Sequence, residues 1–460
     1  MSRKNKTLII AFGFLALLGA GYYGAMAWNK KKAQSTSSSF TPPVILGNLD
    51  SSELVRIEVP GIMLEKNNGT WELVYYDGKI PPGGFDLDQR QIQILTYSLA
   101  SLWIDRVVEE EPEDLSLFGL DNPSARAVVT DSSGRKAEYF LGGSTPSRTS
   151  YYIMEAGDTR VCSISAYSAV FMQIPIDHIR QRTLFPDFEL WALSSFRLEK
   201  DGSRIEIVPK PESALPHLVS SFSSYIFTSP YIFSRGVNGE ALNNLISPFS
   251  NLTIEDFIDD EPSSLAPYGL DRPVRIFIEA GGHSLDLLIG SRTNGSHFAK
   301  LAGAANIFTL GGLENVVNVK PFSLLDKLAL LLNIDSVDQL LITGGEKNLA
   351  ADLRGAADDR IFFLNGRKVE DSSFRNFYQS VIGLVMDAEY PKDSAPNPED
   401  QAGISIEYRL NTPPGELASI WLLPYNRDFY ALRQGGATEF LISRNQIRGI
   451  FDIAEKLVYE

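Results

Sequence analysis

The sequence contains few of the residues on which disulfides, metal centres and nucleic-acid recognition depend. Its 460 residues include one cysteine and four histidines. A single cysteine excludes an intrachain disulfide and a cysteine-rich metal site. Basic residues are also outnumbered, with 42 Lys and Arg against 57 Asp and Glu and a formal net charge of −15. Because phosphate recognition needs a clustered basic surface, we expect no nucleic-acid partner.

Motifs for catalysis and cofactor binding are missing as well. The G-x-S-x-G elbow and the Walker phosphate loop are absent. The histidines, His178, His217, His283 and His297, do not have the spacing of zinc ligands. The acidic stretches around Glu109–Asp114 and Asp256–Glu261 lack the alternating oxygen ligands of a calcium loop, which favours a solvated acidic loop over a calcium site. We expect no enzymatic activity and no cofactor.

One long hydrophobic run is present near the N-terminus. Residues 8–28 carry no charged side chain, and a helix of this length spans about 31 Å, close to the thickness of the hydrocarbon core of a bilayer. The run predicts a transmembrane signal anchor over 8–28 and a polar tether over 29–47, with the bulk of the chain outside the cytoplasm. A signal peptide cleaved after Ala27 is the alternative, because Ala25-Met26-Ala27 matches the cleavage pattern.

The chain repeats itself. Glu110–Pro123 and Asp260–Pro273 both contain Gly-Leu-Asp-x-Pro. The motif residues are Gly119, Leu120, Asp121 and Pro123 in the first copy, and Gly269, Leu270, Asp271 and Pro273 in the second. The third copy lacks this motif, so we expect it to be divergent.

Upstream of each motif position, apolar residues recur every three or four positions, which predicts one amphipathic helix per copy. The apolar sets are Ile92, Leu95, Leu99 and Leu102; Leu242, Leu245, Phe249 and Leu252; and Phe374, Phe377, Val381 and Leu384. The predicted N-caps are Asp88, Asn238, and Asp371 or Ser372.

Alternating strand patterns surround each helix. A hairpin precedes it, as in Leu54–Val59 with Trp71–Tyr76, and two hairpins follow it. A second helix is predicted to close each copy, near Ala166–Met172, Leu324–Leu332 and Arg444–Val458. The predicted fold class is therefore α+β, with three similar units of mostly antiparallel hairpins and amphipathic helices after the N-terminal transmembrane helix. The predicted units are residues 48–189, 190–332 and 333–460.

A family resemblance rests on these motifs. The Gly-Leu-Asp-x-Pro turns, the strand ends Leu141-Gly142 and Ile289-Gly290, and the segment Leu324-Leu325-Asp326-Lys327 resemble the bacterial family catalogued as domain-of-unknown-function 4340. The resemblance implies a membrane-anchored, extracytoplasmic companion of an ABC transporter of the gliding-motility type. Its implied partners are multi-spanning transporter subunits and their ATPase.

Aligning the three copies also gives expectations for single residues. Cys162 corresponds to Phe308 and Phe440, which predicts a buried, unreactive side chain. Asp105, Glu255 and Asp387 each follow the last apolar position of a stripe by three residues. Because a carboxylate opposes the dipole at a helix C-terminus, each of these residues requires a partner. The pattern favours a repeated structural hydrogen bond or ion pair that joins the helix end to the next strand, and the three residues are also candidates for interaction with a partner.

The resulting prediction is a non-enzymatic, membrane-anchored accessory subunit of an ABC-type transporter. The first alternative is a module that binds a cell-envelope polymer such as a glycan through exposed aromatic side chains. The second alternative is an uncharacterised hydrolase, for which the sequence offers no pair of nucleophile and base.

Overall fold

The computed structural model describes residues 44–81, 85–184, 189–212, 223–345, 347–355, 359–391, 403–411 and 414–460. The predicted anchor over 8–28 and most of the predicted tether over 29–47 lie outside these residues. Within the described part of the chain, no helix is sufficiently long and apolar to span a bilayer.

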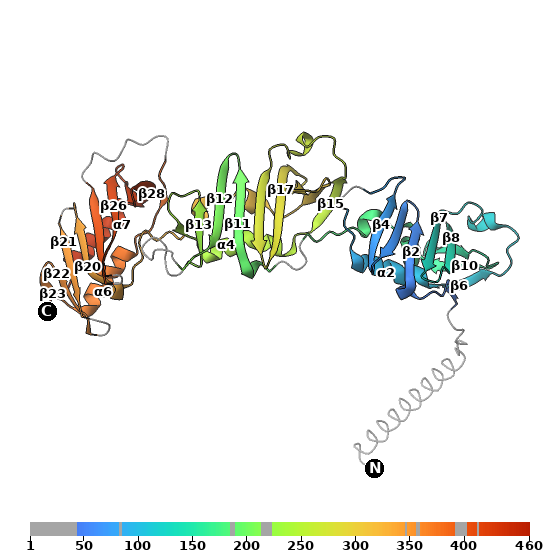
Figure 1. The fold of residues 1–460 in the computed structure, drawn as a ribbon, viewed down its shortest axis with the longest axis horizontal. Coiled ribbons are helices and arrows are strands. Elements are labelled where there is room, and N and C mark those ends of the chain that lie inside the picture. The colour runs from blue at the N-terminus through green and yellow to red at the C-terminus, as the bar shows by residue number, and fades with distance from the viewer. Residues whose placement is uncertain are drawn as a thin grey trace, which may run out of the picture. The chain divides into compact units, whose positions relative to one another are not determined.

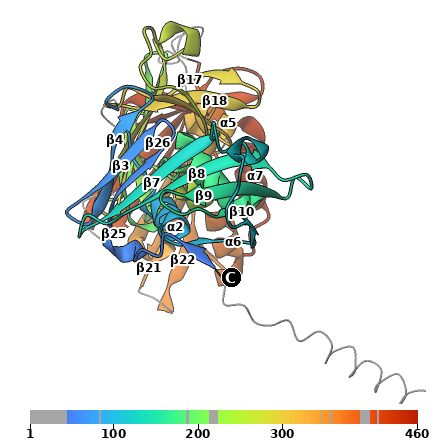
Figure 2. The same ribbon diagram turned by 90° about the vertical axis from the view of Figure 1, so that its right-hand side faces the viewer.

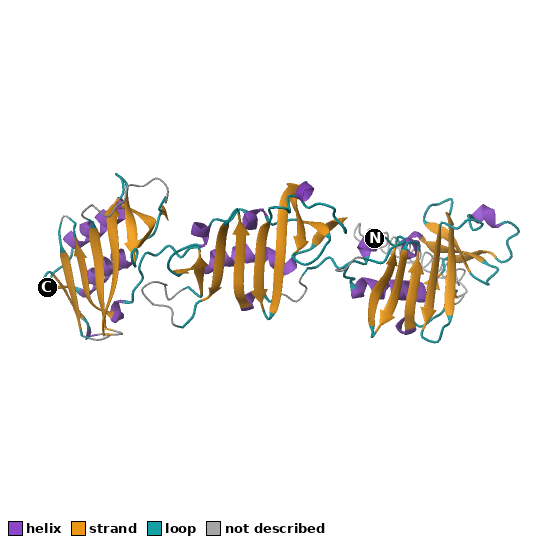
Figure 3. Ribbon diagram, turned by 45° about the horizontal axis from the view of Figure 1, so that its top comes forward, coloured by secondary structure: helices purple, strands orange, loops and turns teal. Residues whose placement is uncertain are grey.

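Antiparallel strands dominate the described residues, which are 45% strand and 22% helix. The predicted α+β class is therefore wrong: the fold is mostly antiparallel β, with few and short helices. The helices are α2 (Gln89–Ala100), α3 (Ala166–Val170), α4 (Gly239–Ile246), α5 (Glu314–Val317), α6 (Asp371–Ile382) and α7 (Arg444–Glu455). Figure 3 shows these helices against the strands of the sheets.

Three large sheets share one strand order (Figure 1). Sheet 1 has the order β4-β3-β2-β7-β8-β9-β10-β6, sheet 2 has β14-β13-β12-β11-β16-β17-β18-β19-β15, and sheet 3 has β23-β22-β21-β20-β25-β26-β27-β28-β24. In each sheet, one meander of strands precedes the amphipathic helix and a second meander follows it. The first strand of each large sheet after the helix, β6, β15 or β24, lies at the far edge of the second meander. Figure 2 shows β7, β8, β9 and β10 of sheet 1 side by side.

The strands have the following bounds. Sheet 1 contains β2 (Leu54–Val59), β3 (Ile62–Asn67), β4 (Thr70–Tyr76), β6 (Arg106–Glu109), β7 (Ala125–Asp131), β8 (Lys136–Ser144), β9 (Ser150–Glu155) and β10 (Val161–Ser165). Sheet 2 contains β11 (Leu193–Lys200), β12 (Ser203–Pro209), β13 (Tyr225–Ser229), β14 (Arg235–Gly236), β15 (Ile254–Asp259), β16 (Val274–Ala280), β17 (His283–Thr293), β18 (Ser296–Leu301) and β19 (Ile307–Leu310). Sheet 3 contains β20 (Val337–Thr343), β21 (Leu349–Arg354), β22 (Ile361–Leu364), β23 (Arg367–Val369), β24 (Ala388–Glu389), β25 (Ile404–Asn411), β26 (Pro414–Pro424), β27 (Phe429–Gln434) and β28 (Ala437–Ser443). A small fourth sheet pairs β1 (Ile45–Leu46) with β5 (Leu102–Trp103).

The predicted amphipathic helices are confirmed as α2, α4 and α6. Their apolar stripes are buried, including Ile92, Leu242 and Phe374. Asp88 and Asn238 cap α2 and α4 as predicted, because each side chain accepts hydrogen bonds from backbone amides of the first turn. The third cap was predicted at Asp371 or Ser372, which is wrong, because Glu370 accepts the bond from the Ser373 amide.

The strand count before each helix was underestimated. In sheet 1, β2 pairs with β3 and β3 pairs with β4, so Leu54–Val59 and Trp71–Tyr76 do not form the predicted hairpin. Sheet 3 likewise has β21 between β20 and β22. Because the prediction left out these strands, it gave the helices too large a share of the fold, which explains part of the error in fold class.

The predicted helix over Leu324–Leu332 is also wrong. A 3-10 helix ends at Leu324, and the chain then runs extended, with Leu325 bridged to Val237 and Leu328 bridged to Val385. These bridges satisfy the backbone groups of an apolar segment by tertiary pairing instead of helix formation. The other two closing helices are confirmed as α3, continued by a 3-10 helix at Phe171–Gln173, and α7.

The described residues form two compact units. One contains the residues up to Pro81 and Leu87–Arg180, and therefore holds sheet 1; we call it the N-terminal unit. The other contains Gln181–Glu460 with the short stretch ending at Asp86, and holds sheets 2 and 3; we call it the C-terminal unit. The boundaries predicted for the three repeats stay a prediction.

Candidate functional site

The Gly-Leu-Asp-x-Pro motif ends a 3-10 helix in both copies. Gly119 and Gly269 have the same left-handed φ of 67°, and the following leucine amides donate to the carbonyls of Leu115 and Leu265. A Cβ on Gly119 would lie 2.9 Å from the backbone nitrogen of Gly143. Glycine is therefore required both for the backbone conformation and for close approach to the next strand.

The rest of the motif holds this turn against its sheet. Leu120 and Leu270 are buried, whereas Asp121 and Asp271 are exposed and Pro123 and Pro273 are half-buried. An edge-to-face aromatic pair follows in both copies, with ring centroids 5.1 Å apart for Phe118 and Tyr152 and 5.2 Å apart for Tyr268 and Phe298. The buried leucines and the aromatic pairs therefore contribute to the packing of the turn.

Asp105 and Glu255 make the same contact in sheets 1 and 2. Each side chain accepts a hydrogen bond from the serine that begins the third strand of the second meander, Ser150 for Asp105 and Ser296 for Glu255. These two contacts are repeated structural hydrogen bonds, which is one of the two interpretations that the sequence offers for Asp105 and Glu255.

Asp387 makes a different local contact. It accepts from the Ser443 amide at 2.7 Å and from Gln446 Nε2 at 2.9 Å, which joins it to the start of α7. The structure does not bring Asp105, Glu255 and Asp387 together into one site, and their role toward a partner stays a prediction.

The titratable residues that the sequence singled out lie in packed surroundings. Cys162 is buried on β10, and burial raises the pKa of its thiol. His297 is buried on β18 with Nε2 3.7 Å from Glu314 Oε2, and burial lowers its pKa despite that carboxylate. In the second acidic loop, Asp259 accepts a hydrogen bond from the Tyr268 hydroxyl, which raises the pKa of that tyrosine. Across the described ranges, no three His, Cys, Asp or Glu side chains form a group that could hold a metal ion.

The outward face of α2 differs from its counterparts. Ile94 and Tyr97, one turn apart, are 45% and 62% exposed. When the three stripes are aligned, Asn244 and Asn376 take the position of Ile94, and Ser247 and Gln379 take the position of Tyr97. An amphipathic helix ordinarily presents polar residues to solvent, so the apolar pair on α2 is not explained by packing within the unit.

Helix α3 also exposes an apolar pair. On α3, Tyr167 and Val170 are 75% and 49% exposed, and α2 contacts the 3-10 helix that continues α3. The corresponding short helix α5 exposes Glu314 and Asn315 instead. We call Ile94, Tyr97, Tyr167 and Val170 the outward helical surface of the N-terminal unit.

The first strand of the described chain pairs with the strand that follows α2. Ile45 of β1 pairs with Trp103 of β5, directly after α2, and the Trp103 side chain is 61% exposed. The structure thus connects α2 to the segment that follows the hydrophobic run. Chemically, these apolar and aromatic side chains are suited to a protein contact, in which tyrosine and tryptophan are enriched.

Sequence reasoning missed this surface because it followed only the buried stripes. The signal was present: positions 94 and 97 are apolar in the first copy and polar in the other two. Comparing the outward positions of the copies, in addition to the buried ones, would have found it.

The geometry defines a class of proteins built from repeated antiparallel sheets with a glycine-capped turn. The family model described as "Domain of unknown function (DUF4340)" matches residues 80–273 and, a second time, residues 227–388. The chain belongs to this family. Both matches begin shortly before an amphipathic helix, α2 or α4, so the family model follows the internal repeat. Comparison with curated proteins and with solved structures gives no match.

Proposed function

We propose that this protein is a non-enzymatic interaction protein that serves as an accessory subunit of an ABC-type transporter. It is anchored in the cell membrane by residues 8–28, with the bulk of the chain outside the cytoplasm. Its outward helical surface docks on the multi-spanning subunits of the transporter. The transporter supplies the pore and the ATPase, for which this chain has no motif.

The observation that carries the proposal is the difference between equivalent helices. Ile94 and Tyr97 are exposed where the other repeats have polar residues. Burying a large apolar side chain at an interface stabilises it by about 1.5–3 kcal/mol, so two such residues are enough for a hot spot.

A membrane-embedded partner is favoured by the position of the surface. The exposed Trp103 pairs with the first described strand, and the chain before that strand contains the hydrophobic run. A subunit in the same membrane is therefore the partner that the N-terminal unit meets first. The alternative of an anionic lipid surface would require basic residues, and none belong to the outward helical surface.

The experiment is crosslinking in intact cells, followed by gentle detergent extraction and mass spectrometry of the tagged full chain. We expect recovery of multi-spanning subunits and an ATPase. The double variant Ile94→Asn with Tyr97→Ser, which copies the second repeat, should lower this recovery by about tenfold or more. The control variant Asn376→Ser with Gln379→Ser, on the outward face of α6, should leave it unchanged.

Two outcomes would contradict the proposal. A protein that purifies alone after crosslinking, or with envelope polysaccharide in place of protein subunits, would refute the role as a transporter subunit. Protection of residues 44–460 from protease added to spheroplasts would refute the location outside the cytoplasm.

A further inference from the structure

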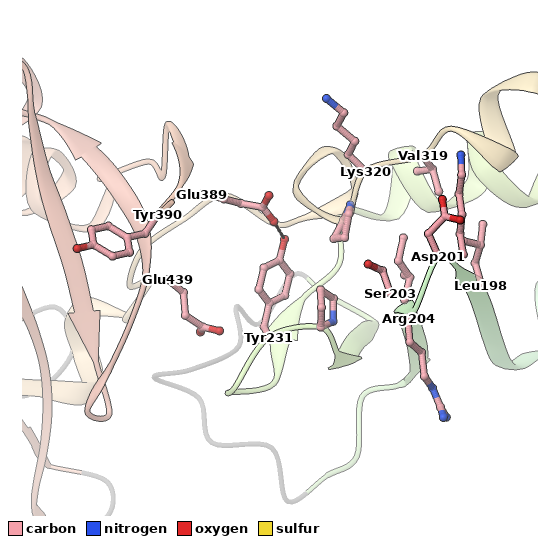
Figure 4. A pocket seen from close by; sticks show the side chains of 14 residues that line it. Leu198, Asp201, Ser203, Arg204, Tyr231, Val319, Lys320, Glu389, Tyr390 and Glu439 are labelled. Atoms are coloured by element: carbon pink, nitrogen blue, oxygen red, sulfur yellow. Dashed lines mark hydrogen bonds between the residues drawn. The ribbon is translucent and has the colours of Figure 1, made fainter. Parts of the chain in front are cut away.

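One cavity of the C-terminal unit, of about 460 Å³, lies where sheet 2 meets sheet 3 (Figure 4). Its polar side chains are engaged with one another. The Tyr231 hydroxyl donates to Glu389 Oε1 at 2.9 Å, and Glu439 is paired with the buried Arg235 at 3.6 Å. These contacts join the two sheets, so this cavity belongs to a structural junction.

A second cavity lies on the face of sheet 3 that points away from α6 and α7. On β26, Ile420 and Leu422 are buried in the core that also contains the apolar stripe of α6, so the alternate residues face the other way. The cavity has a volume of about 430 Å³, in the range of small-molecule sites. It is lined by Ser419, Trp421, Leu423, Arg433, Gly435 and Gly436. We call it the sheet 3 cavity.

Trp421 supplies an aromatic ring to the sheet 3 cavity. Its side chain is 46% exposed, and it lies opposite Ser405 of β25 on one side and Arg433 of β27 on the other. Ser405 is buried and shares a hydrogen bond of 2.6 Å with the Thr343 hydroxyl. Because this serine is small and is turned toward Thr343, it leaves the indole uncovered.

An ion pair occupies the corresponding place in the other two sheets. Each pair joins an arginine to a carboxylate across the first two strands of the second meander. The pairs are Arg126 with Glu138 at 2.6 Å in sheet 1 and Arg275 with Asp286 at 2.7 Å in sheet 2. The strand register places Ser405 and Ser419 at these positions in sheet 3, and it places Trp421 where the other sheets have Phe140 and Leu288. Two serines in place of a long ion pair therefore open the space over Trp421.

A glycine turn borders the same cavity. Gly435 and Gly436 connect β27 to β28 with φ of 58° and 89°. A Cβ on Gly435 would lie 2.6 Å from Cζ of the Phe233 ring, whereas nothing lies within 4 Å of a Cβ on Gly436. The turn is thus packed on one side and open on the other, and no side chain of its own covers its peptide groups.

This lining suits an uncharged ligand with an apolar face and hydroxyl groups around its edge. None of the described lining residues is Asp or Glu, which disfavours a cationic ligand, and the net charge of −15 disfavours a nucleotide. A β-linked pyranose of the gluco configuration carries C–H groups on its faces and hydroxyl groups around its ring. The C–H groups match the electron-rich face of an indole, and the hydroxyl groups match serine and peptide groups.

We propose that the sheet 3 cavity binds a polysaccharide of β-linked, gluco-configured sugars. One pyranose ring stacks on the indole of Trp421. Its hydroxyl groups form hydrogen bonds with Ser419 and with peptide groups of the Gly435–Gly436 turn. This activity goes beyond the proposed role at a transporter and does not depend on the outward helical surface.

The test is calorimetric titration of the purified full chain, in a detergent whose head group is not a sugar. The two probes are cellohexaose and hexa-N-acetylchitohexaose, which share the gluco configuration and differ in the group at C2. We expect at least one of them to bind at millimolar concentration or below, and the preferred probe distinguishes a glucan from a polymer of N-acetylglucosamine.

The informative variants copy the other sheets. Trp421→Leu, which carries the residue of sheet 2, should weaken binding about tenfold or more, whereas Trp421→Phe, which carries the residue of sheet 1, should stay within about threefold because a ring remains. Ser419→Glu should weaken binding about tenfold by filling the cavity, and it leaves the tryptophan in place. Trp191→Leu is the matched control, because Trp191 is 80% exposed before β11 and lies outside the cavity, and it should leave the affinity unchanged.

Urea unfolding of each variant shows that a loss of binding is not a loss of folding. No heat with either hexasaccharide at millimolar concentration would overturn the proposal, as would an unchanged affinity in Trp421→Leu or an equal loss in Trp191→Leu. A dimer of the full chain that Trp421→Leu dissociates would also overturn it, because the face would then be an interface between copies. None of these readouts requires transporter subunits, so failure here is distinguishable from failure of the proposed function.

Discussion

Replacing Gly119 with alanine tests the structural account of the repeated motif. The left-handed φ of 67° costs a non-glycine residue about 1–2 kcal/mol. The new methyl group would also lie 2.9 Å from the Gly143 nitrogen and 3.4 Å from its Cα. Because these are backbone atoms, relief requires the turn and strand β8 to separate, at about 1–3 kcal/mol more. The expected loss in free energy of unfolding is about 2–5 kcal/mol.

Gly134 provides the matched control. Its φ is 85°, but nothing lies within 4 Å of the position that a methyl group would take, so Gly134→Ala should cost only the conformational part. The assay is urea unfolding of the full chain, read by hydrogen exchange in peptides from Leu87–Arg180 so that the N-terminal unit is followed separately. An equal loss for Gly119→Ala and Gly134→Ala would refute the close approach to β8 as a source of stability.

Three further predictions concern buried titratable groups. Burial raises the pKa of Cys162, so its alkylation by iodoacetamide at pH 8 should be at least about tenfold slower in the folded chain than in urea; equal rates would contradict its burial. Arg235→Ala should lower the free energy of unfolding of the C-terminal unit by about 3–5 kcal/mol, because it leaves Glu439 buried without its cation; a loss under about 1 kcal/mol would show that the ion pair is not needed. The lowered pKa of His297 means that the unfolded chain binds its proton more readily. Stability should therefore fall as the pH drops through about 6.5, and it should fall less in His297→Tyr, which carries the residue of repeat 1; parallel pH profiles would contradict this.

The elements that depend on local periodicity could be predicted from the sequence. The stripe at Phe374, Phe377 and Val381 determines both the existence of α6 and its buried face, because the spacing alone sets which side chains align. The turn at Gly119 was also visible, since glycine adopts the left-handed conformation at the least cost.

Elements that depend on distant partners could not be predicted. The run Leu324–Leu332 is largely apolar, and its helical or extended state is decided by the backbones of Val237 and Val385. The same limit applies to the buried ion pair of Arg235 with Glu439, because the two residues are far apart in the sequence and have no periodic relation. Only the outward helical surface could have been found earlier, by comparing the exposed positions of the copies.

The shared strand order has a consequence for how the chain matures. Strand β6 (Arg106–Glu109) pairs with β10 (Val161–Ser165) and with no earlier strand, so it waits unpaired while the intervening residues are made. At about 5–20 residues per second on the ribosome, that wait lasts several seconds. Strand β10 nevertheless ends before β11 begins at Leu193, and no strand of sheet 1 pairs with a later sheet among the described residues. Each sheet can therefore be completed before the next one is synthesised, which limits the time during which unpaired edges of neighbouring repeats coexist and could exchange strands.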